Sequence, residues 1–422
     1  MNILIINLHS ARNLGDDAIM YATLEGLKET FPSARIILAA NDPRSWERYR
    51  CRDASVEVVG SLTTWVAYLK RGYWHARWSA VLIDVPLLIL AALFYRLLRI
   101  RFLWGSQEKR RLLSAYYDAD LVISCGGGNF YAHFWISLFF LVSLAALGLA
   151  IIMDRKVVML PQSIGPIKGW LQRQLTRTLL NRVNKIMVRE PRSLEFIQNA
   201  LCLRKQAVLV PDLAFTFTPT EHSSVRLQDL QSGLKIGVTI IDRAAQVKGK
   251  VFTAAQQEIY EEALVAALGE ISRKYGATIY LFPQCTGPDF AHDDRQALHR
   301  VFLRLYEQGT PVVLFDEFSN FLELKAVYAL MDCIVGSRMH TAIFAISLGI
   351  PVILISYQPK SIGMMEYVGL GRFCYEIGFL DQDRLVSGLS ELIENRDKIK
   401  KMIRERYSEI QERLQRWRYE VV

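Results

Sequence analysis

The sequence predicts an α/β protein made of two Rossmann-like domains that face a central cleft, with an apolar, membrane-associating insertion in the first domain. Strand-length apolar runs alternate with helical patterns along nearly the whole chain, which is typical of a parallel sheet covered by helices. A polar stretch at residues 218–233 divides this alternation into two halves. The chain has 422 residues, which suffices for two or three domains.

In the first half, short apolar runs are each followed by a polar turn. Residues 2–8 form a run too short for a helix that would bury itself, so a strand is predicted there. The turn at residues 9–17 leads into a helix that Asp16 or Asp17 can cap. Further strands of this half are predicted at residues 35–40, 120–124, 156–160, 185–188 and 207–210.

The second half repeats the alternation after the polar stretch, which is the predicted linker. Its strands are predicted at residues 235–241, 277–282, 312–315, 333–336 and 352–355. We expect an N-terminal domain at residues 1–222, a C-terminal domain at 234–385 and, from its helical spacing, a C-terminal amphipathic helix at 386–422. This layout resembles the double-Rossmann, GT-B-like arrangement of many glycosyl-processing enzymes, whose ligands lie at the carboxyl ends of the strands.

The positive charge of the chain is concentrated in one stretch. The formal net charge is +9, and residues 44–111 alone hold thirteen basic and five acidic residues. The same stretch holds five of the eight tryptophans. A nucleic-acid binder usually spreads its basic residues over a polar face, whereas here they flank an apolar run. This pattern favours an anionic membrane surface as the partner and argues against nucleic acid.

The apolar insertion, at about residues 65–111, contains the run 79–95, which carries Asp84 and Pro86. Arginine and tryptophan at both ends are typical of an in-plane interfacial anchor. The alternative is a helical insertion that packs on the protein itself. Because the chain has no secretory signal and no paired cysteine spacing, we expect a cytoplasmic protein that is peripheral on the inner face of the cell membrane.

A second apolar run, residues 134–153, contains no charged residue and is long enough to span a bilayer. It lies between two polar motifs, at residues 126–128 and 161–166, that should face the same cleft. A membrane span would place these motifs on opposite sides of a membrane. We therefore predict a buried helix that covers the sheet.

Seven short motifs follow one another along the chain. They are Asn13–Asp17, Gly126–Gly128, Gln162–Pro166, Arg189–Glu190, Pro211–Asp212, Gly336–His340, and Lys360 with Met364–Glu366. Each is weak alone, but in this order they resemble the polysaccharide pyruvyl transferases over residues 1 to about 385. The sequence departs from the family at Asn129, where a fourth glycine is common.

The resemblance implies transfer of pyruvate from phosphoenolpyruvate to two hydroxyls of one sugar, as a cyclic ketal, with release of phosphate. The setting would be cell-envelope or exopolysaccharide biosynthesis. The N-terminal domain would then be the acceptor side, for a saccharide that is free or lipid-linked, and the C-terminal domain would be the donor side. Phosphoenolpyruvate is then a co-substrate, and no cofactor is expected. No HExxH motif, Walker lysine or cysteine–histidine cluster is present, so no metal is implied.

This chemistry needs guanidinium groups for the donor's phosphate and carboxylate. Arg338 and Arg189 each follow a predicted strand and are the candidates, although Arg189 could instead pair with Glu190 or Asp212 at the surface. His340 is the candidate acid/base, because imidazole titrates near neutrality. Asp16 and Asp17 are further catalytic candidates unless they only cap the first helix. Substrate binding is also predicted for His9, Asn13, Gly126, Gly127, Gly128, Gln162, Ser337, Lys360 and Glu366.

Two other functions fit parts of the same pattern. A GT-B-type glycosyltransferase with a nucleotide-sugar donor also needs basic side chains and a helix N-terminus, so the fold alone does not separate it from a pyruvyl transferase. A membrane-bound scaffold without catalysis is the third possibility, and it gives no reason for the arginine and histidine of Gly336–His340.

Overall fold

The computed structural model describes residues 1–67, 83–132, 134–216, 232–247 and 251–422, and it divides into two compact α/β units. Unit 1 comprises Met1–Ala11, Ile19–Leu213 and Gln415–Val422. Unit 2 comprises Arg12–Ala18 and Ala214–Leu414. The first helix, α1, therefore begins in unit 2 and continues in unit 1.

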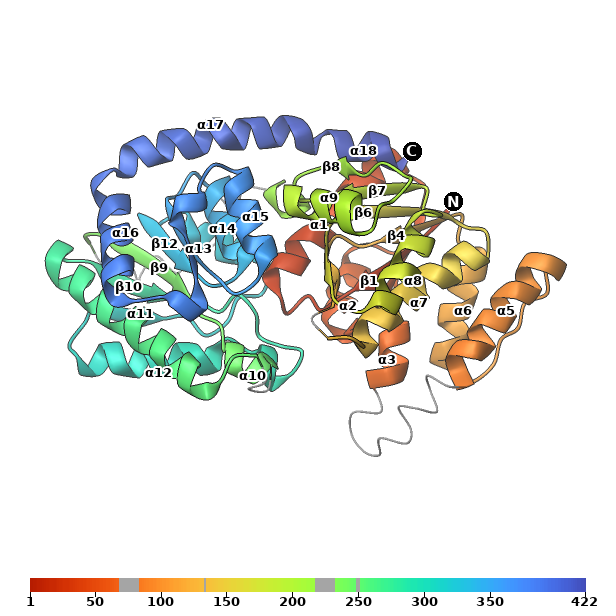
Figure 1. The fold of residues 1–422 in the computed structure, drawn as a ribbon, viewed down its shortest axis with the longest axis horizontal. Helices are drawn as coiled ribbons and strands as arrows, with labels where there is room; N and C mark the ends of the chain where they lie inside the picture. The colour runs from red at the N-terminus through yellow and green to blue at the C-terminus, as the bar shows by residue number, and fades with distance from the viewer. Residues whose placement is uncertain (68–82, 133, 217–231, 248–250) are drawn as a thin grey trace. The chain divides into compact units, whose positions relative to one another are not determined.

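Unit 1 is built on a parallel sheet with the strand order β3-β2-β1-β4-β6-β7-β8, and β5 pairs with the second half of β6 (Figure 1). The strands are β1 (Asn2–Leu8), β2 (Arg35–Ala40), β3 (Val56–Gly60), β4 (Leu121–Ser124), β5 (Gly127–Ala132), β6 (Lys156–Ile167), β7 (Lys185–Val188) and β8 (Val208–Leu209). Apolar residues fill these strands because a parallel sheet is buried on both faces.

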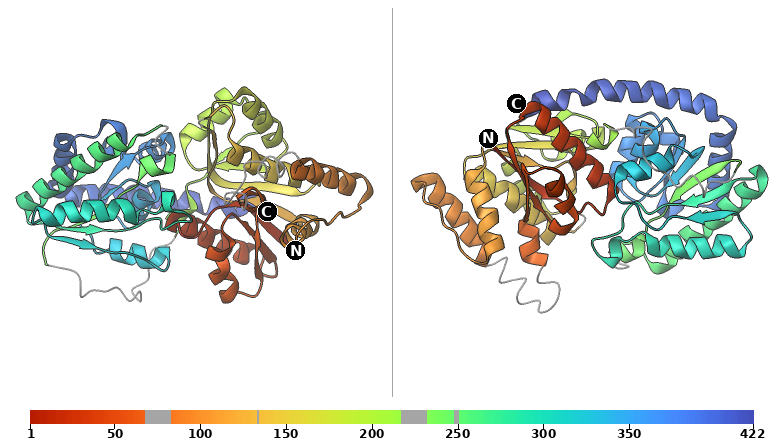
Figure 2. Two further views of the ribbon diagram at one scale, coloured as in Figure 1. Left: turned by 90° about the horizontal axis from the view of Figure 1, so that it is seen from below. Right: turned by 180° about the vertical axis from the view of Figure 1, so that it is seen from behind.

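Helices lie on both faces of each sheet (Figure 2). Those whose residues lie mainly in unit 1 are α1 (Leu14–Thr30), α2 (Pro43–Arg52), α3 (Leu62–Ala67), α5 (Val85–Leu98), α6 (Gln107–Asp118), α7 (Leu138–Ile152), α8 (Trp170–Leu180), α9 (Pro191–Glu195) and α18 (Arg416–Val421).

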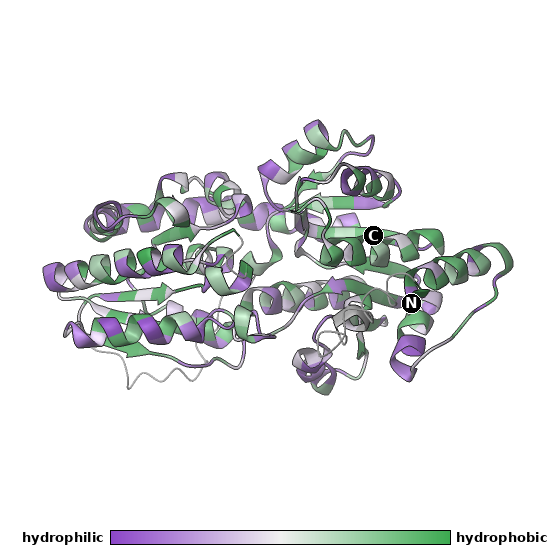
Figure 3. Ribbon diagram, turned by 60° about the horizontal axis from the view of Figure 1, so that its bottom comes forward, coloured by the Kyte–Doolittle hydropathy of each residue, from purple (hydrophilic) through white to green (hydrophobic). Residues whose placement is uncertain are grey.

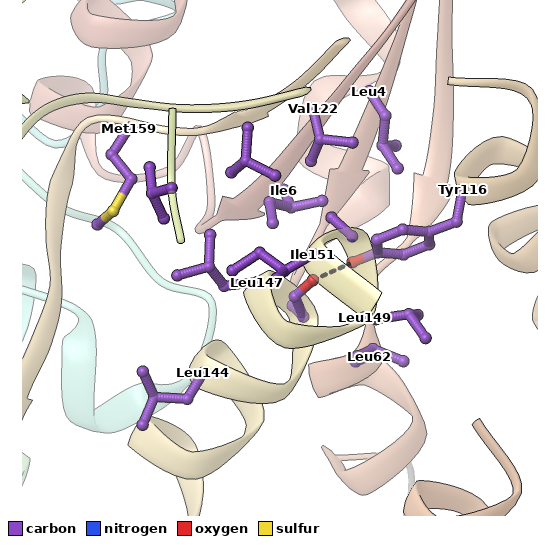
Figure 4. Packing of buried hydrophobic residues seen from close by; sticks show 14 of the residues in the cluster. Leu4, Ile6, Leu62, Tyr116, Val122, Leu144, Leu147, Leu149, Ile151 and Met159 are labelled. Atoms are coloured by element: carbon purple, nitrogen blue, oxygen red, sulfur yellow. Dashed lines mark hydrogen bonds between the residues drawn. The ribbon is translucent and has the colours of Figure 1, made fainter. Parts of the chain in front are cut away.

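The predicted buried helix at residues 134–153 is confirmed as α7 over residues 138–152, whereas Phe134, Trp135 and Ile136 precede the helix and are exposed. Leu147 and Ile151 of this helix point toward the strand residue Ile6, and the hydroxyl of Tyr116 donates to the carbonyl of Ala146 at 3.0 Å (Figure 4). In the described part of the chain, no helix is long and apolar enough to cross a membrane.

Unit 2 has a second parallel sheet with the order β11-β10-β9-β12-β13-β14. Its strands are β9 (Lys235–Thr239), β10 (Thr278–Leu281), β11 (Val312–Leu314), β12 (Cys333–Gly336), β13 (Val352–Ser356) and β14 (Cys374–Glu376). Its helices are α10 (Arg243–Val247), α11 (Ala254–Tyr275), α12 (Arg295–Glu307), α13 (Phe321–Tyr328), α14 (Met339–Ser347), α15 (Pro359–Tyr367), α16 (Gln382–Glu394) and α17 (Arg396–Leu414).

Two segments predicted as loops are strands. The glycines of Gly126–Gly128 do not turn the chain into a helix, because the chain continues directly into β5. The segment at residues 161–166 lies within β6, whose second half pairs with β5. Gly126 permits this pairing, because a Cβ atom there would lie 2.8 Å from the carbonyl oxygen of Pro161. Strands β3 and β14 are also absent from the predicted set.

The C-terminal residues form three helices, α16, α17 and α18, in place of the one predicted amphipathic helix. The predicted apolar positions are nevertheless buried, including Leu389, Ile410 and Trp417. In unit 1, Trp417 occupies the space beside Gly26, where a Cβ atom would lie 2.2 Å from the indole ring.

Parts of two other predictions lie outside the described residues. These are the linker, where residues 217–231 are not described, and the insertion, where residues 68–82 are not described. The described remainder of the insertion includes α5, which buries only Leu88, Ala91, Ala92 and Tyr95.

Unit 2 also buries a lysine. Lys325 of α13 is fully buried, and its Nζ atom lies 5.2 Å from the centroid of the Phe344 ring. Because burial disfavours the ammonium form, it lowers the pKa of Lys325 from 10.5 to about 7. Protonation of this side chain near neutral pH therefore destabilises the folded state of unit 2.

Lys325→Met should stabilise the protein, and more strongly at low pH. Between about pH 7 and 10.5 the unfolded chain holds this proton and the folded chain does not, so stability rises with pH in that window. We expect a gain of about 2–4 kcal/mol in the free energy of unfolding at pH 6.5, falling by more than half at pH 9.5. Urea unfolding measures it, with the exposed Lys401→Met as control. An equal gain at both pH values would contradict the prediction.

Candidate functional site

The residues singled out from the sequence fall into two groups, one in each unit. Unit 2 contains Asn13, Asp16, Asp17, Ser337, Arg338, His340, Lys360 and Glu366. Unit 1 contains His9, Gly126, Gly127, Gly128, Gln162 and Arg189. The N-terminal motif Asn13–Asp17, which we expected on the acceptor side, thus groups with the C-terminal residues expected to bind the donor.

Backbone hydrogen bonds hold the segment Arg12–Ala18 in unit 2. The N–H of Leu14 donates to the carbonyl of Gln284 at 3.1 Å, and the N–H of Thr286 donates to the carbonyl of Arg12 at 3.0 Å. The loop that accepts this segment follows β10, at the carboxyl edge of the sheet. The N-terminal motif is therefore fixed at the edge where parallel sheets bind ligands.

Gly15 lies directly against the imidazole of His340. A Cβ atom at position 15 would lie 2.0 Å from His340 Nδ1 and 2.1 Å from Cγ. The φ of Gly15 is outside the left-handed region, so the reason for a glycine is space and not backbone conformation. His340 itself is in the first turn of α14 and is 8% exposed. The predicted acid/base and the N-terminal motif are therefore neighbours.

Arg338 is held in place by Asp294. The Nε atom of Arg338 donates to Asp294 Oδ2 at 2.8 Å, and Nη2 donates to Oδ1 at 2.5 Å. Asp294 also accepts the N–H of Cys285 at 2.9 Å. Within the described residues, Nη1 of Arg338 makes no hydrogen bond. The guanidinium predicted to bind a donor oxyanion is thus partly engaged, and Nη1 remains as its open donor.

The Arg338–Asp294 pair is almost entirely shielded from solvent, with side chains 10% and 1% exposed. Burial opposes the charge on Arg338, but the attraction of the Asp294 carboxylate outweighs it and raises the pKa of Arg338. Burial also raises the pKa of Asp294. The neighbouring thiol of Cys285 has its pKa raised to about 12 by burial, so it is neutral and a poor nucleophile.

The two aspartates of the N-terminal motif have different surroundings. Asp17 is fully buried, and its Oδ2 atom accepts the N–H of Phe321 at 3.2 Å, at the start of α13. Asp16 is half-buried and accepts from Asn13 Nδ2 at 3.0 Å. Neither aspartate caps the first helix as predicted, because α1 begins at Leu14 and both lie in its first turn. Asp17 instead accepts a backbone N–H at the start of α13, and Asp16 is the aspartate whose carboxylate remains accessible.

Ser337 is fully buried and sits among hydroxyl groups. Its Oγ atom donates to the carbonyl of Thr239 at 3.1 Å and lies 2.6 Å from the hydroxyl of Tyr260. Desolvation raises the pKa of Tyr260, so this phenol is neutral. These contacts tie the end of β12 to β9 and α11, and they orient the turn that carries Arg338.

A second arginine, which the sequence analysis missed, lies at the same edge. Arg243 follows β9, the neighbour of β12, and its Cζ atom lies 4.8 Å from the centroid of the Tyr357 ring. The N–H of Arg243 donates to Gln257 Oε1 at 2.9 Å. Tyr357 follows β13 and is close enough to Arg338 to affect its pKa. The sequence did contain a signal for Arg243, because this charged residue lies two positions after the strand predicted at residues 235–241.

Lys360 and Glu366 are both in α15, which follows β13. Lys360 is half-buried in the first turn, at the carboxyl edge of the sheet. Glu366 is exposed and nearly two turns further along the helix, about 9 Å away along its axis. Three consecutive strands, β9, β12 and β13, thus place Arg243, Arg338 and Lys360 at one edge.

In unit 1, Arg189 is buried in an ion pair. Its Nη1 atom donates to Asp212 Oδ2 at 2.6 Å, and its Nε atom donates to Ser163 Oγ at 2.9 Å. Both charged side chains are 2% exposed, so this is not the surface pair weighed as the alternative. The adjacent Glu190 caps α9, and burial raises its pKa.

Gln162 lies beside Arg189, whose N–H donates to the Gln162 carbonyl at 3.3 Å. The Gln162 side chain is fully buried, yet neither amide atom has a hydrogen-bond partner among the described residues. Asn129, in the adjacent β5, donates to the carbonyl of Asn7 at 2.6 Å, while its Oδ1 atom also has no described partner. Buried polar groups without partners are uncommon and favour a ligand or bound water nearby.

His9 follows β1 in unit 1 and stacks on Phe139, with ring centroids 5.4 Å apart. Its Nδ1 atom lies 3.4 Å from Asn41 Nδ2. Over the residues that the structure describes, no group of three or more His, Cys, Asp or Glu side chains could hold a metal ion.

The two parallel sheets, with the candidate residues at strand ends, define a two-unit α/β protein with a GT-B-like fold. The chain belongs to the polysaccharide pyruvyl transferase family, whose family model matches residues 13–359. This range contains the unit 2 group from Asn13 to His340 and both arginines predicted from the sequence, whereas Lys360 and Glu366 lie beyond its end.

The chain is similar to the amylovoran biosynthesis protein AmsJ of Erwinia amylovora, with 25% identity over 96% of this chain and 94% of that protein. Among solved structures, it is similar to a UDP-GlcNAc 2-epimerase from Neisseria meningitidis, with a TM-score of 0.55, 14% identity, and coverage of 96% and 94% of the two chains. It is also similar to the glycotransferase of kitacinnamycin, with a TM-score of 0.51, 12% identity, and coverage of 98% and 94%. These structural likenesses show the fold alone.

Gly15→Ala should displace the imidazole of His340 without unfolding the protein. Alanine favours a helix over glycine by about 1 kcal/mol, so the stability change should be small. The added methyl group would overlap the ring, which must turn away. We expect the NMR signal of His340, assigned with His340→Gln, to shift. Gly378→Ala, where the space is empty, is the matched control. An unmoved signal in Gly15→Ala would contradict the contact.

Proposed function

We propose that this protein transfers pyruvate from phosphoenolpyruvate to a saccharide as a cyclic ketal, with release of phosphate, in exopolysaccharide or cell-envelope synthesis. Membership of the polysaccharide pyruvyl transferase family and the likeness to AmsJ support this proposal. The single observation that carries it is the fixed set of Gly15, Arg338 and His340, braced by Asp294 at one sheet edge.

The donor carries a phosphate and a carboxylate, and the unit 2 group offers cations for both. Arg338 presents Nη1 beside the N-terminus of α14, where backbone N–H groups favour an anion. Arg243 and Lys360 follow the neighbouring strands on either side of β12. Because a planar guanidinium matches two oxygens of an oxyanion, we assign Arg338 to the donor and Arg243 as its supporting cation.

The reaction needs one proton delivered and two removed. The enol methylene of the donor takes a proton at C3 while a sugar hydroxyl adds to C2 and loses its own proton. The C2–O bond to phosphate then breaks, phosphate leaves, and the second hydroxyl adds at C2 with loss of its proton. We assign to His340 either the delivery of the proton to C3 or the removal of the proton from the first hydroxyl, and Asp16 is the nearby accessible carboxylate for the other of these two transfers. The proton of the second hydroxyl leaves with the phosphate.

A nucleotide-sugar glycosyltransferase is not favoured by the family match, although the fold class is shared with such enzymes. Thermal shift with phosphoenolpyruvate against UDP- and GDP-sugars separates the two directly. A ligand at 100 times its Kd stabilises the protein by about 2.7 kcal/mol, so a true donor gives a clear shift.

Removing Arg338 should weaken binding of phosphoenolpyruvate. Because Arg338→Ala alone would leave the Asp294 carboxylate buried without its partner, the test uses Arg338→Met/Asp294→Asn, which removes both charges. We expect a loss of about 10- to 100-fold in donor affinity, as for a hydrogen bond to a charged group. Arg338→Lys should rescue poorly. Calorimetry with phosphoenolpyruvate measures it, with the exposed Arg406→Ala as control. Unchanged affinity in the double variant would exclude Arg338.

We also propose that the protein binds an anionic membrane surface, on the inner face of the cell membrane, to reach a lipid-linked acceptor. The described part of the insertion supports this. Leu90, Phe94 and Leu97 of α5 are 50%, 43% and 76% exposed, and Arg96 and Arg99 lie at its C-terminal end. In Figure 3 the ribbon of α5 is coloured hydrophobic along most of its length.

The salt dependence of membrane binding should be partial. Basic side chains contribute about 1 kcal/mol each near an anionic leaflet and are screened by salt, whereas apolar burial is not. Flotation with anionic liposomes should therefore weaken at high salt without disappearing. Leu90→Ser/Phe94→Ser/Leu97→Ser should weaken the salt-resistant part, with Leu303→Ser, an exposed leucine of unit 2, as control. Failure of the intact chain to float would exclude the membrane surface.

A further inference from the structure

A second exposed apolar feature of unit 1 lies outside the insertion. We call it the apolar tip and define it as Phe134, Trp135 and Ile136, which precede α7, with Trp170 and Leu171, which open α8. The exposed fractions of these side chains are 52%, 74%, 78%, 63% and 61%. Large apolar side chains gathered in this way usually mark a binding surface.

The backbone under the tip is fixed by a buried glutamine. Gln172 is 2% exposed, and its Nε2 atom donates to the carbonyls of Phe134 and Trp135 at 3.0 Å each. Its Oε1 atom accepts the N–H of Ser137 at 2.9 Å. The chain thus holds this turn in one conformation while the turn's own side chains face solvent.

The two parts of the tip are held side by side. A Cβ atom at Gly169 would lie 2.4 Å from the carbonyl oxygen of Trp135, so only glycine allows this approach. The N–H of Lys168 donates to the carbonyl of Ala132 at 3.1 Å, just before the turn. Trp170 and Trp135 therefore project from neighbouring backbone positions, beside the N-terminal ends of two helices, α7 and α8, that contact each other.

The charged residues of α8 and of the two residues before it are all basic. Lys168 precedes α8, and Arg173 and Arg177 lie within it. From residue 134 to residue 180 the only acidic side chain is Asp154, which follows the far end of α7, about 22 Å along the helix. A basic rim beside exposed tryptophans is complementary to phosphate headgroups over an apolar layer.

We propose that the apolar tip inserts into the headgroup region of an anionic bilayer, with Trp135 and Trp170 as interfacial anchors and α8 supplying the cations. Indole suits this depth because its ring is apolar and its N–H finds polar partners. The inference deepens the proposed membrane association and rests on it, but it names a contact separate from α5. It does not depend on the chemistry of pyruvyl transfer.

The test is flotation of the full chain carrying Trp135→Ser/Trp170→Ser. The vesicles are phosphatidylcholine alone or with phosphatidylglycerol, at about 0.15 M salt, where the Debye length is about 8 Å. The matched control is Tyr306→Ser/Phe379→Ser, which replaces two aromatic side chains of unit 2 that are 68% and 73% exposed. We expect the partition coefficient on anionic vesicles to fall at least about tenfold in the tip variant and to change less than about twofold in the control.

Three further measurements make the outcome decisive. Brominated lipids should quench a component of tryptophan fluorescence in the intact chain that the tip variant lacks. Urea unfolding and phosphate release with a water-soluble acceptor should match the intact chain. Equal flotation of variant and intact chain, or a variant that instead dissociates a dimer in sedimentation, would overturn the tip contact alone. If the intact chain binds no vesicle, the tip and the α5 proposals fall together, while pyruvyl transfer in solution still tests the proposed reaction.

Discussion

The organisation of the candidate site depends on the backbone pairing of Arg12–Ala18 with the loop that follows β10. Without the hydrogen bonds to Gln284 and Thr286, Gly15 would have no fixed position and the ring of His340 would have no wall on that side. Breaking this pairing is unfavourable, because a buried backbone donor or acceptor without a partner costs about as much free energy as a lost hydrogen bond. A segment from the beginning of the chain thereby completes a unit formed mostly by its second half.

The buried Arg338–Asp294 pair imposes the second constraint on the site. A desolvated ion pair contributes little net stability, and its removal as a pair often costs nothing. Its effect here is directional: with Nε and Nη2 engaged by Asp294, only Nη1 has no described partner. Arg243 has a different restraint, an aromatic ring at 4.8 Å. Two buried guanidinium groups at adjacent strand ends are thus oriented by different means, which suits a ligand with two oxyanions.

The strand pattern of this fold could be predicted from the sequence because parallel strands are buried on both faces and read as short apolar runs. The strands at residues 2–8, 35–40, 185–188 and 333–336 are confirmed with the same bounds. The β5–β6 pairing was missed because glycine, asparagine and proline predict turns, whereas here neighbouring backbone makes those positions extended. Arg338 and His340 were found because they follow a clear strand. The pairing of Arg338 with Asp294 could not be predicted, since residues 44 positions apart meet only through the fold.

Two buried glutamines of unit 1 differ in whether the protein itself supplies hydrogen-bond partners for their side-chain amides. Both amide atoms of Gln172 are used by the backbone beneath the apolar tip, so its burial needs no ligand. Neither amide atom of Gln162 has a hydrogen-bond partner among the described residues, although the side chain is fully buried. A buried amide without a hydrogen-bond partner destabilises the folded state by about 1–3 kcal/mol. Such a group is expected where a bound ligand or water supplies the missing hydrogen bonds. Gln162, beside the Arg189–Asp212 pair, therefore has the stronger claim to contact a substrate in unit 1 than the better-packed glycines of the same motif series.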